Sequence, residues 1–354
     1  MIPMKWAIVG TGDFALDWVL SAARESAVAE PVAIVTRDVA DAQSRRPHTA
    51  VPFVGDLVEA LSLGAEAVHI ITPNATHRSI AVAAAQLGMH VLVEKPMAPS
   101  LEDAHAIVGA ATEAGVGLAV GSCMAWSPVV VAVRGALTDP SFGRVRHIEI
   151  SAGFDAGEGR GWRHVTPTAL GGGVLMDLGA HAVDAAERLV GPVQAVRGML
   201  RSTLRDHRAD DRALIMLEHQ SGVTSSIDVA FTHACNALTV TGDGGRLVGR
   251  EWLGRRFAGE LHWERGSIDA ARSPSTASDD VRLATAMVDV VRCQMDEVSR
   301  AFRSGCSAPH AEAAAGLSVV AILEAAMESD RRGGSAVRLV GNHGWGMSDG
   351  LSYE

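Results

Sequence analysis

Lys95 is the residue that first suggests chemistry, because the chain has only two lysines among its 31 basic residues. It follows Glu94 at the end of the apolar run Val91–Val93 and directly precedes Pro96. The pKa of a lysine ammonium can be lowered for proton transfer, whereas a guanidinium stays charged. Lys95 is therefore a candidate for proton transfer in a ligand site. The alternative is an ordinary exposed lysine at a strand end.

Asp177 and His181 form a second candidate pair, shortly after the triple glycine Gly171–Gly173. On a helix these two residues are four positions apart and share a face, with Asp184 three positions further on. A carboxylate can orient a neighbouring imidazole, and histidine is suited to passing protons at neutral pH. We expect Asp177 to orient His181 and His181 to transfer a proton. The alternatives are a helix-surface ion pair and a packed core histidine.

The N-terminal segment predicts a strand, a glycine turn and a helix in succession. Gly10, Gly12 and Ala15 follow the dinucleotide fingerprint, in which the first glycine makes the turn and the second lets the backbone approach a pyrophosphate. An ordinary tight turn would use similar residues, but the strand before it and the helix after it are the context that the motif requires. We expect nucleotide binding by Gly10, Thr11, Gly12, Asp13, Phe14 and Ala15.

Thr36 and Arg37 stand at the end of the second predicted strand, where a protein that prefers NAD usually has an acidic residue for the ribose hydroxyls. An arginine at this place can instead bind the 2′-phosphate of NADP. The sequence therefore favours NADP(H), with NAD(H) as the other candidate. The alternative is that Arg37 is a solvated surface residue and that Asp38 reaches the ribose.

Short apolar strands and helical patterns alternate over the first 122 residues and would position these groups. Strands are expected at Lys5–Val9, Pro31–Thr36, Ala67–Thr72, His90–Val93 and Val116–Gly121, and helices at Ala15–Arg24, Ile80–Leu87 and Leu101–Ala114. This alternation predicts an α/β Rossmann domain over residues 1–122 with a doubly wound parallel sheet. In such a sheet the carboxyl ends of the strands face the ligand, and Lys95 follows one of them.

Beyond Pro128 strand patterns follow one another without a helix between each. They are expected at Arg146–Phe154, Gln194–Leu204, Arg212–His219, Val223–Phe231 and Ala237–Thr241, with helices at Val174–Leu189, Val281–Arg303 and Ala311–Ser329. This predicts an α+β domain over residues 123–340 with a large, mostly antiparallel, open-faced sheet. The segment Gly266–Ser278 is expected to form a loop or a lid, and residues 341–354 are expected to form a tail.

The composition excludes several classes of protein. A net charge of −10 disfavours a general nucleic-acid or membrane-surface protein. The single tyrosine, Tyr353, lies next to the C-terminus, which excludes reductases that use a tyrosine hydroxyl beside a lysine. The four cysteines form no Cys-x-x-Cys pair, so neither a metal site nor a disulfide framework is predicted. No apolar run has the length of a membrane span, and we expect a cytoplasmic protein.

Together these motifs resemble the glucose-fructose oxidoreductase and inositol dehydrogenase family (Gfo/Idh/MocA) over nearly the whole chain. The resemblance is carried by Gly10-x-Gly12-x-x-Ala15, Thr72-Pro73-Asn74-x-x-His77, Glu94-Lys95-Pro96, Trp162-Arg163, the Gly171–Asp184 helix and the closing helix Ala311–Ser329. Trp6, Gly161–Arg163 and the segment from Phe231 are most similar to the 1,5-anhydro-D-fructose reductase branch. The resemblance implies that Lys95, Asp177 and His181 are catalytic. It also implies that Thr72, Pro73, Asn74, His77 and Glu94 line the cofactor.

The expected activity is reversible hydride transfer between nicotinamide and a sugar, a cyclitol or a related polyol. Candidate substrate-binding residues are Trp126 and Trp162, whose faces can stack on a sugar ring, and Arg163 and His164, which can bind hydroxyl or acid groups. Ordinary packing or surface roles are the alternatives for all four. Ala125 and Trp126 stand where many family members have a polar residue before an aromatic one, so substrate identity is not transferred.

Two other function classes remain as alternatives to the expected activity. One is a redox-neutral NAD-dependent glycosidase or lyase, which would reduce and reoxidise its cofactor within one cycle. The other is a non-catalytic dinucleotide sensor, against which the combination of Lys95, Asp177 and His181 argues. The expected partners are a small sugar or cyclitol and a second copy of the chain, in a homodimer or homotetramer through the open sheet face, with neither nucleic acid nor membrane.

Overall fold

Each of the two units of the chain contains two separate segments of the sequence. The computed structural model describes residues 2–157, 161–203, 209–266, 280–283, 285–306, 308, 311–340 and 352–353. The first unit contains Met1–Cys123 and Val291–Leu317, and the second contains Met124–Val290 and Ser318–Glu354. The candidate lid after Gly266 and most of the tail from residue 341 lie outside the described residues.

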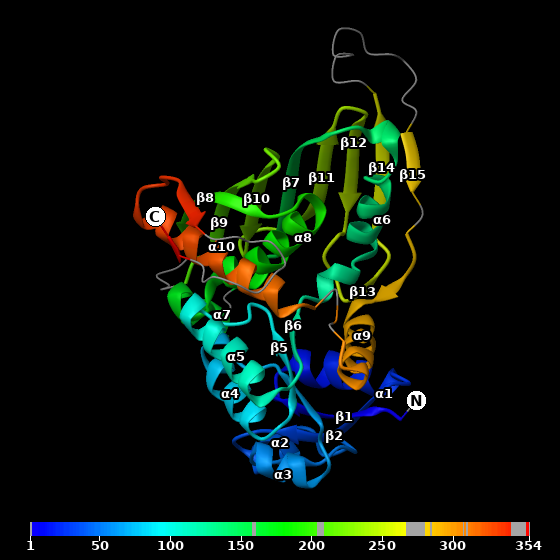
Figure 1. The fold of residues 1–354 in the computed structure, drawn as a ribbon, viewed down its shortest axis with the longest axis vertical. Coiled ribbons are helices and arrows are strands. Elements are labelled where there is room, and N and C mark those ends of the chain that lie inside the picture. Colours follow the sequence, from blue (N-terminus) through cyan, green and yellow to red (C-terminus); the bar gives the residue numbers. More distant parts are fainter. Residues whose placement is uncertain are drawn as a thin grey trace. The chain divides into compact units, whose positions relative to one another are not determined.

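Six parallel strands form the sheet of the first unit, in the order β3-β2-β1-β4-β5-β6 (Figure 1). Their bounds are β1 Met4–Val9, β2 Ala29–Val35, β3 Phe53–Val54, β4 Ala67–Ile70, β5 His90–Glu94 and β6 Leu118–Gly121. The inner strands are mostly apolar because both faces of a parallel sheet are covered. The strand order reverses between the neighbours β1 and β4, and ligands bind at the carboxyl ends of strands at such a point. The predicted doubly wound parallel sheet is confirmed.

The helices of the first unit follow the strands with short connections. They are α1 Leu20–Glu25, α2 Val39–Arg45, α3 Leu57–Ser62, α4 His77–Gln86, α5 Leu101–Ala114 and α9 Val290–Ser304. Helix α5 has the predicted bounds because the Ser100 hydroxyl caps the Asp103 N–H and Gly115 ends the helix at a φ of 66°. Helices α4 and α5 lie side by side in Figure 1.

Helix α9 belongs to the first unit although it comes from residues far along the chain. The buried Trp6 donates its indole N–H to Ser299 Oγ at 3.0 Å, and Phe302 stacks on His90 with ring centroids 4.9 Å apart. Arg303 forms an ion pair with Glu66. The structure therefore places residues 291–317 in the first unit, with the parallel sheet. The sequence pattern predicted a second domain that is continuous from residue 123 to residue 340.

A ten-stranded sheet forms the second unit, in the order β15-β14-β12-β11-β7-β10-β9-β8-β17-β18. Its strands are β7 Val145–Gly153, β8 Val193–Arg201, β9 Arg212–His219, β10 Thr224–Ala230, β11 Cys235–Gly242, β12 Gly245–Arg250, β14 Glu260–Arg265, β15 Asp280–Leu283, β17 Val337–Val340 and β18 Ser352–Tyr353. Neighbouring strands are antiparallel except β7 and β10. The prediction of a large, mostly antiparallel sheet is confirmed.

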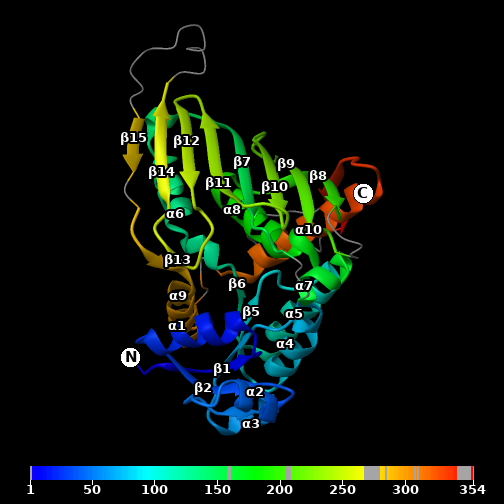
Figure 2. The same cartoon turned by 180° about the vertical axis from the view of Figure 1, so that it is seen from behind.

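Helices α6 (Pro128–Ala136), α8 (Ala180–Val190) and α10 (Ala313–Arg331) lie on one face of this sheet (Figure 1). Side chains alternate between the two faces along each strand. Ile148 and Ile150 of β7 are buried on the helix side, whereas Met216 of β9 is 58% exposed on the other. Figure 2 shows this second face without a covering helix among the described elements.

The helix predicted at Val281–Arg303 is wrong over its first part. Asp280–Leu283 pairs with β14 as β15, and Val288–Asp289 forms β16 against β13 (Arg256–Phe257). Asp289 also forms an ion pair with Arg256 at 3.0 Å. Because Val288 and Asp289 pair as a strand, α9 begins only at Val290. Tertiary pairing outweighs helix propensity in this stretch, whose valines also favour strands.

The described ranges contain no helix that combines the length and the apolarity needed to cross a membrane. The four cysteines, all within these ranges, form no disulfide.

Glu187 on α8 is expected to make the stability of the second unit depend on pH. Burial raises its pKa to about 7, although Ser318 Oγ and the Val193 N–H both hydrogen-bond its carboxylate. The folded state therefore holds the proton more tightly than the unfolded state, and the free energy of unfolding falls as the pH rises from about 4.5 to about 7. Glu187→Gln should raise this free energy at pH 8 by roughly 1 to 2 kcal/mol, and by much less at pH 5.

Urea unfolding at the two pH values measures this effect. Glu149→Gln, which replaces an exposed carboxylate on β7 of the same unit, is the control. An equal gain for Glu187→Gln at both pH values would contradict the titration of Glu187.

Candidate active site

Gly10 and Gly12 form the turn at the end of β1. Gly10 has a φ of 127°, and its N–H donates to the Val35 carbonyl at 3.0 Å. A Cβ on Gly10 would lie 2.6 Å from the Ile71 carbonyl oxygen, so this residue is held between the ends of β2 and β4. A Cβ on Gly12 would meet no described atom within 4 Å. The backbone at Gly12 therefore faces open space, as a turn that admits a pyrophosphate requires.

The helix after this turn begins with the π-helical turn η1 (Phe14–Val19) and continues as α1. Such turns are frequent at functional sites. Arg46, at the end of α2, pairs with Asp17 at 2.7 Å and lies 3.7 Å from Asp13. Its guanidinium offsets two carboxylates beside a turn where a phosphate would add negative charge. Reasoning from the sequence did not find Arg46, because nothing local to α2 indicates this contact.

Thr36 and Arg37 lie directly after β2, with Arg37 exposed. Asp38 follows them and caps α2, since its Oδ1 accepts the Asp41 N–H at 2.9 Å. The Asp38 N–H faces Thr36 Oγ1 at 3.4 Å. One carboxylate oxygen of Asp38 is therefore engaged by the helix, while Arg37 is exposed at the carboxyl edge of the sheet.

His77 connects the segment after β4 with the segment after β5. It is fully buried, with one ring nitrogen 3.0 Å from the Thr72 carbonyl and the other 3.2 Å from the Pro96 carbonyl. Burial lowers the pKa of His77, which favours the neutral ring. Of the other predicted cofactor residues here, Pro73 is exposed and Asn74 is buried. His77 can therefore act on a ligand only through the two segments that it joins.

Glu94 ends β5 as a buried carboxylate with a partner that was not predicted. Its Oε1 lies 3.1 Å from Nε2 of His69, a fully buried residue of β4, and its Oε2 accepts the Lys95 N–H at 3.3 Å. Nδ1 of His69 has no hydrogen-bond partner among the described residues, so the proton fits best on Nε2. Gly121 of β6 makes room for the carboxylate, because a Cβ there would lie 2.6 Å from Oε1.

The sequence signal for His69 was a polar residue within an otherwise apolar strand, which is a weak signal alone. Lys95 itself is partly exposed at the carboxyl end of β5, and its peptide bond to Pro96 is cis.

Three glycines precede the helix of the second unit that carries Asp177 and His181. Gly171 and Gly173 have φ values of 94° and 84°, and a Cβ on Gly172 would lie 1.9 Å from the Thr166 carbonyl oxygen. The chain then enters the π-helical turn η6 (Leu175–Gly179), which carries Asp177, and continues as α8, which carries His181. A helix is present where it was predicted, but its first turn is a π turn.

Arg163 lies against Asp177. The short helix α7 (Trp162–Val165) brings the Arg163 Nε to 3.4 Å from Asp177 Oδ2, and the guanidinium carbon lies 4.9 Å from the centroid of the Trp162 ring. The Asp177 side chain is 17% exposed and that of Arg163 43% exposed. The structure thus unites a predicted substrate residue with a predicted catalytic one in an ion pair that the sequence did not indicate.

His164 and Trp126 are the remaining predicted substrate residues, and both are partly exposed. The His164 ring lies 4.9 Å from the ring of Phe231, which in turn lies 5.2 Å from Phe154. Trp126 ends the short 3₁₀ helix η3 (Cys123–Trp126). Aromatic and cationic side chains therefore accompany Asp177 in the second unit, a combination suited to a polar ring-shaped ligand.

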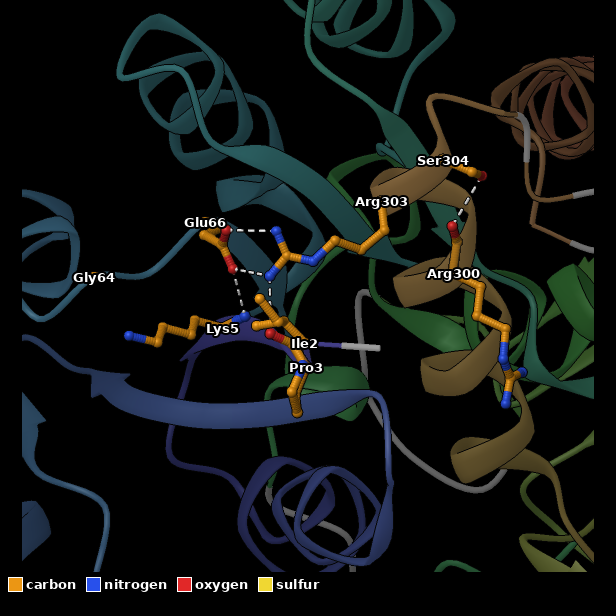
Figure 3. A pocket seen from close by; sticks show the side chains of 8 residues that line it. All are labelled: Ile2, Pro3, Lys5, Gly64, Glu66, Arg300, Arg303 and Ser304. Carbon is orange, nitrogen blue, oxygen red and sulfur yellow. Dashed lines mark hydrogen bonds and ion pairs between the residues drawn. The ribbon is translucent and has the colours of Figure 1, made fainter.

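A hollow of about 600 Å³ lies in the first unit at the opposite, amino edge of the sheet. Its lining includes Pro3 and Lys5 at the start of β1 and Glu66 just before β4. Figure 3 shows the Glu66 carboxylate facing Arg303, while the Lys5 and Arg300 side chains point away in different directions. The hollow is therefore not part of the nucleotide edge.

The arrangement provides two kinds of chemistry. The first unit has a glycine turn, a cation after β2 and a lysine at one sheet edge, which together fit a dinucleotide. The second unit has an imidazole and a carboxylate on one helix, with Arg163 against the carboxylate. Among the described residues no group of three His, Cys, Asp or Glu side chains could hold a metal ion.

Comparison with known proteins gives two family matches. Residues 4–122 match the oxidoreductase family with an NAD-binding Rossmann fold, and residues 130–248 match the GFO/IDH/MocA C-terminal domain. A 1,5-anhydro-D-fructose reductase of Ensifer adhaerens is 31% identical over 73% of this chain and 79% of its own length. A D-xylose 1-dehydrogenase (NADP(+)) 2 of Haloferax volcanii is 28% identical over 95% of this chain and 100% of its own length.

Among solved structures, an aldose-aldose oxidoreductase from Caulobacter crescentus complexed with glycerol has the same fold. Its TM-score is 0.84 at 24% identity, over 95% of this chain and 100% of that one. The family matches, the relatives and the Gly10–Gly12 turn all indicate the same family. This chain is a member of the Gfo/Idh/MocA family of NAD-binding oxidoreductases.

Proposed function

We propose that this protein transfers a hydride reversibly between a nicotinamide dinucleotide and a carbinol or ketone carbon of a sugar, a cyclitol or a related polyol. The observation that carries the proposal is the helix with Asp177 and His181, which begins after the closely packed turn Gly171–Gly173. The other unit has the Gly10–Gly12 turn, where the backbone at Gly12 faces open space. The names of the relatives support the substrate class, since they include a sugar reductase and a sugar dehydrogenase.

The residues have separate roles in this proposal. In the oxidative direction His181 takes the proton of the substrate hydroxyl, while the hydrogen on carbon leaves with its electron pair. The bound dinucleotide supplies the acceptor for that hydride at the nicotinamide C4. Asp177 orients His181, and the Arg163 ion pair holds Asp177 in place. Lys95 hydrogen-bonds the substrate oxygen and stabilises the charge that develops on it.

Substrate recognition is assigned to Arg163 and Trp162 beside Asp177, and to Trp126 and His164 of the same unit. The ring of Trp162 offers an apolar face to the C–H groups of a sugar, and Trp126 offers a second. Arg163 and His164 donate to hydroxyl or acid groups. This combination favours a polyhydroxylated ring over an apolar ketone.

The test is a spectrophotometric assay of nicotinamide reduction and oxidation with a panel of polyols and keto-sugars. Substrate-dependent turnover with at least one member supports the proposal. Cofactor-dependent stabilisation of the protein without any net change in nicotinamide absorbance would contradict it. That result would favour a redox-neutral lyase or glycosidase if a substrate is consumed, and a sensor if none is.

We further propose that NADP(H) is preferred over NAD(H). Arg37 is exposed at the end of β2, while one oxygen of Asp38 caps α2 and is not available to the ribose. Arg37→Ala should weaken NADPH binding by about tenfold or more, because a hydrogen bond to a charged group contributes about 1.5 to 3 kcal/mol. NADH binding should stay nearly unchanged, since NADH has no 2′-phosphate.

Titration of both reduced cofactors by fluorescence measures these affinities. Arg45→Ala removes an arginine of α2 that pairs with Asp41 and serves as the matched control. Equal affinity of the wild type for NADH and NADPH, with no loss of NADPH affinity in Arg37→Ala, would overturn the preference.

We propose that two copies of the chain pair through the helix-free face of the large sheet. Met216 and Met199 are 58% and 41% exposed on neighbouring strands of that face. Met216→Arg should convert a dimer or a larger assembly into monomers, because an interface cannot bury an unpaired guanidinium. Val131→Arg, at a similarly exposed position of α6, should leave the assembly intact. Light scattering at micromolar concentration gives the masses, and a monomeric wild type would refute the pairing.

A further inference from the structure

Asp210, just before β9, closes the turn that precedes the helix with Asp177 and His181. Its Oδ1 accepts Thr168 Oγ1 at 2.5 Å, and its Oδ2 accepts the Leu175 N–H at 2.8 Å. Its carbonyl oxygen accepts the Val174 N–H at 3.0 Å, and its own N–H donates to Thr168 Oγ1 at 3.3 Å. One residue thus binds both ends of the segment 168–175.

The carboxylate of Asp210 occupies space that only glycine leaves open. A Cβ on Gly173 would lie 1.9 Å from Asp210 Oδ1, and Asp210 is 6% exposed. Burial raises the pKa of Asp210 to about 6, while the hydrogen bonds from Thr168 and Leu175 oppose this rise. A buried carboxylate with both oxygens engaged has one favourable orientation, because any rotation leaves charge without a donor.

We propose that Asp210 is a positioning residue that fixes the start of the η6–α8 helix and thereby the directions of Asp177 and His181. The Leu175 N–H is one of the donors that a helix leaves without an internal partner in its first turn. A carboxylate at this end also interacts favourably with the helix dipole.

Leu175 precedes Asp177 by two residues and His181 by six, so both lie within two helical turns of its N–H. Loss of the hydrogen bond at this N–H would therefore loosen the backbone that carries both side chains. The effect on turnover rests on the proposed hydride transfer, whereas the effect on the helix does not. Asp210 acts through the helix and is not assigned a contact with the substrate.

The experiment compares Asp210→Ala and Asp210→Asn with the matched control Asp211→Ala. Asp211 is the next residue and is 8% exposed, but both of its oxygens accept the Thr203 N–H. Its replacement therefore removes buried hydrogen bonds of the same kind at a different segment. The readouts are kcat and KM for a turned-over polyol, the Kd for the dinucleotide, and deuterium uptake by the peptide that covers residues 168–181.

We expect Asp210→Ala to lower kcat by about 10- to 100-fold, because small misplacements of reacting groups have effects of this size. The dinucleotide Kd should change little, since the predicted nucleotide residues lie in the first unit. Asp210→Asn should recover most of kcat, because its amide can accept the Leu175 N–H and donate to Thr168 Oγ1. Asp211→Ala should keep kcat near the wild-type value, whatever its effect on stability.

Deuterium uptake over residues 168–181 should rise in Asp210→Ala and stay unchanged in Asp211→Ala. Wild-type kcat in Asp210→Ala, or an equal loss in Asp211→Ala, would overturn the proposal. If no polyol is turned over by the wild type, the proposed function fails while deuterium uptake still decides the role of Asp210. Unchanged uptake in Asp210→Ala would overturn it in that case as well.

Discussion

His181→Ala is expected to lower kcat by about 10²- to 10⁴-fold, the usual contribution of a general acid or base. The reason is that the alanine side chain cannot take the hydroxyl proton, which must then pass to water. The dinucleotide Kd should stay within about twofold of the wild type, because the predicted nucleotide residues belong to the other unit. Steady-state kinetics with the best polyol and a fluorescence titration of NADPH measure the two quantities.

His147→Ala is the matched control for this prediction. His147 is also a partly exposed histidine of the second unit, but it lies on β7, where its ring hydrogen-bonds Thr224 and Ser226. Its replacement should leave kcat near the wild-type value. Full turnover in His181→Ala would remove His181 from the mechanism, and an equal loss in both variants would show a general effect on folding.

The second large effect is expected at the turn of Gly10 and Gly12, where alanine should impair the protein in two different ways. Gly12→Ala should leave the melting temperature of the cofactor-free protein nearly unchanged, because its Cβ would meet no described atom within 4 Å. The same Cβ would occupy the space that a pyrophosphate needs. Dinucleotide affinity should therefore fall at least about tenfold, which corresponds to the loss of one charged hydrogen bond.

Gly10→Ala is the contrasting variant. Its φ of 127° and the Ile71 carbonyl oxygen at 2.6 Å from the new Cβ should lower the stability of the cofactor-free protein by about 1 to 3 kcal/mol. Differential scanning fluorimetry with and without NADPH separates the two effects. Retained stabilisation by NADPH in Gly12→Ala would mean that the dinucleotide does not approach the backbone at this turn.

Local sequence patterns were sufficient for most elements of the fold. Helix α5 has its predicted bounds because Ser100 caps its N-terminus and Gly115 ends it in a left-handed conformation. The parallel and antiparallel sheets were both predicted, since continuous apolar runs and alternating strands differ in the sequence itself. The failure at residues 281–289 occurred where short strands pair with partners 16 to 33 residues away, which no local period indicates.

The sequence alone identified the candidate residues of the site, because scarcity and motif spacing are properties of the chain. Lys95, the glycine turn and the Asp177–His181 pair are of this kind. Contacts between distant residues appeared only in the tertiary structure. Arg163 meets Asp177, and His69 meets Glu94, through packing of separate segments.

Two further contacts between distant residues appeared only in the tertiary structure. Helix α9 packs with the first unit, and Asp210 closes the turn of Gly171–Gly173. The physical reason is that residue spacing determines which side chains share one face of a helix or strand. Which other element packs on that face depends on where buried polar groups find hydrogen-bond partners and apolar surfaces are covered. That choice is made by the whole fold.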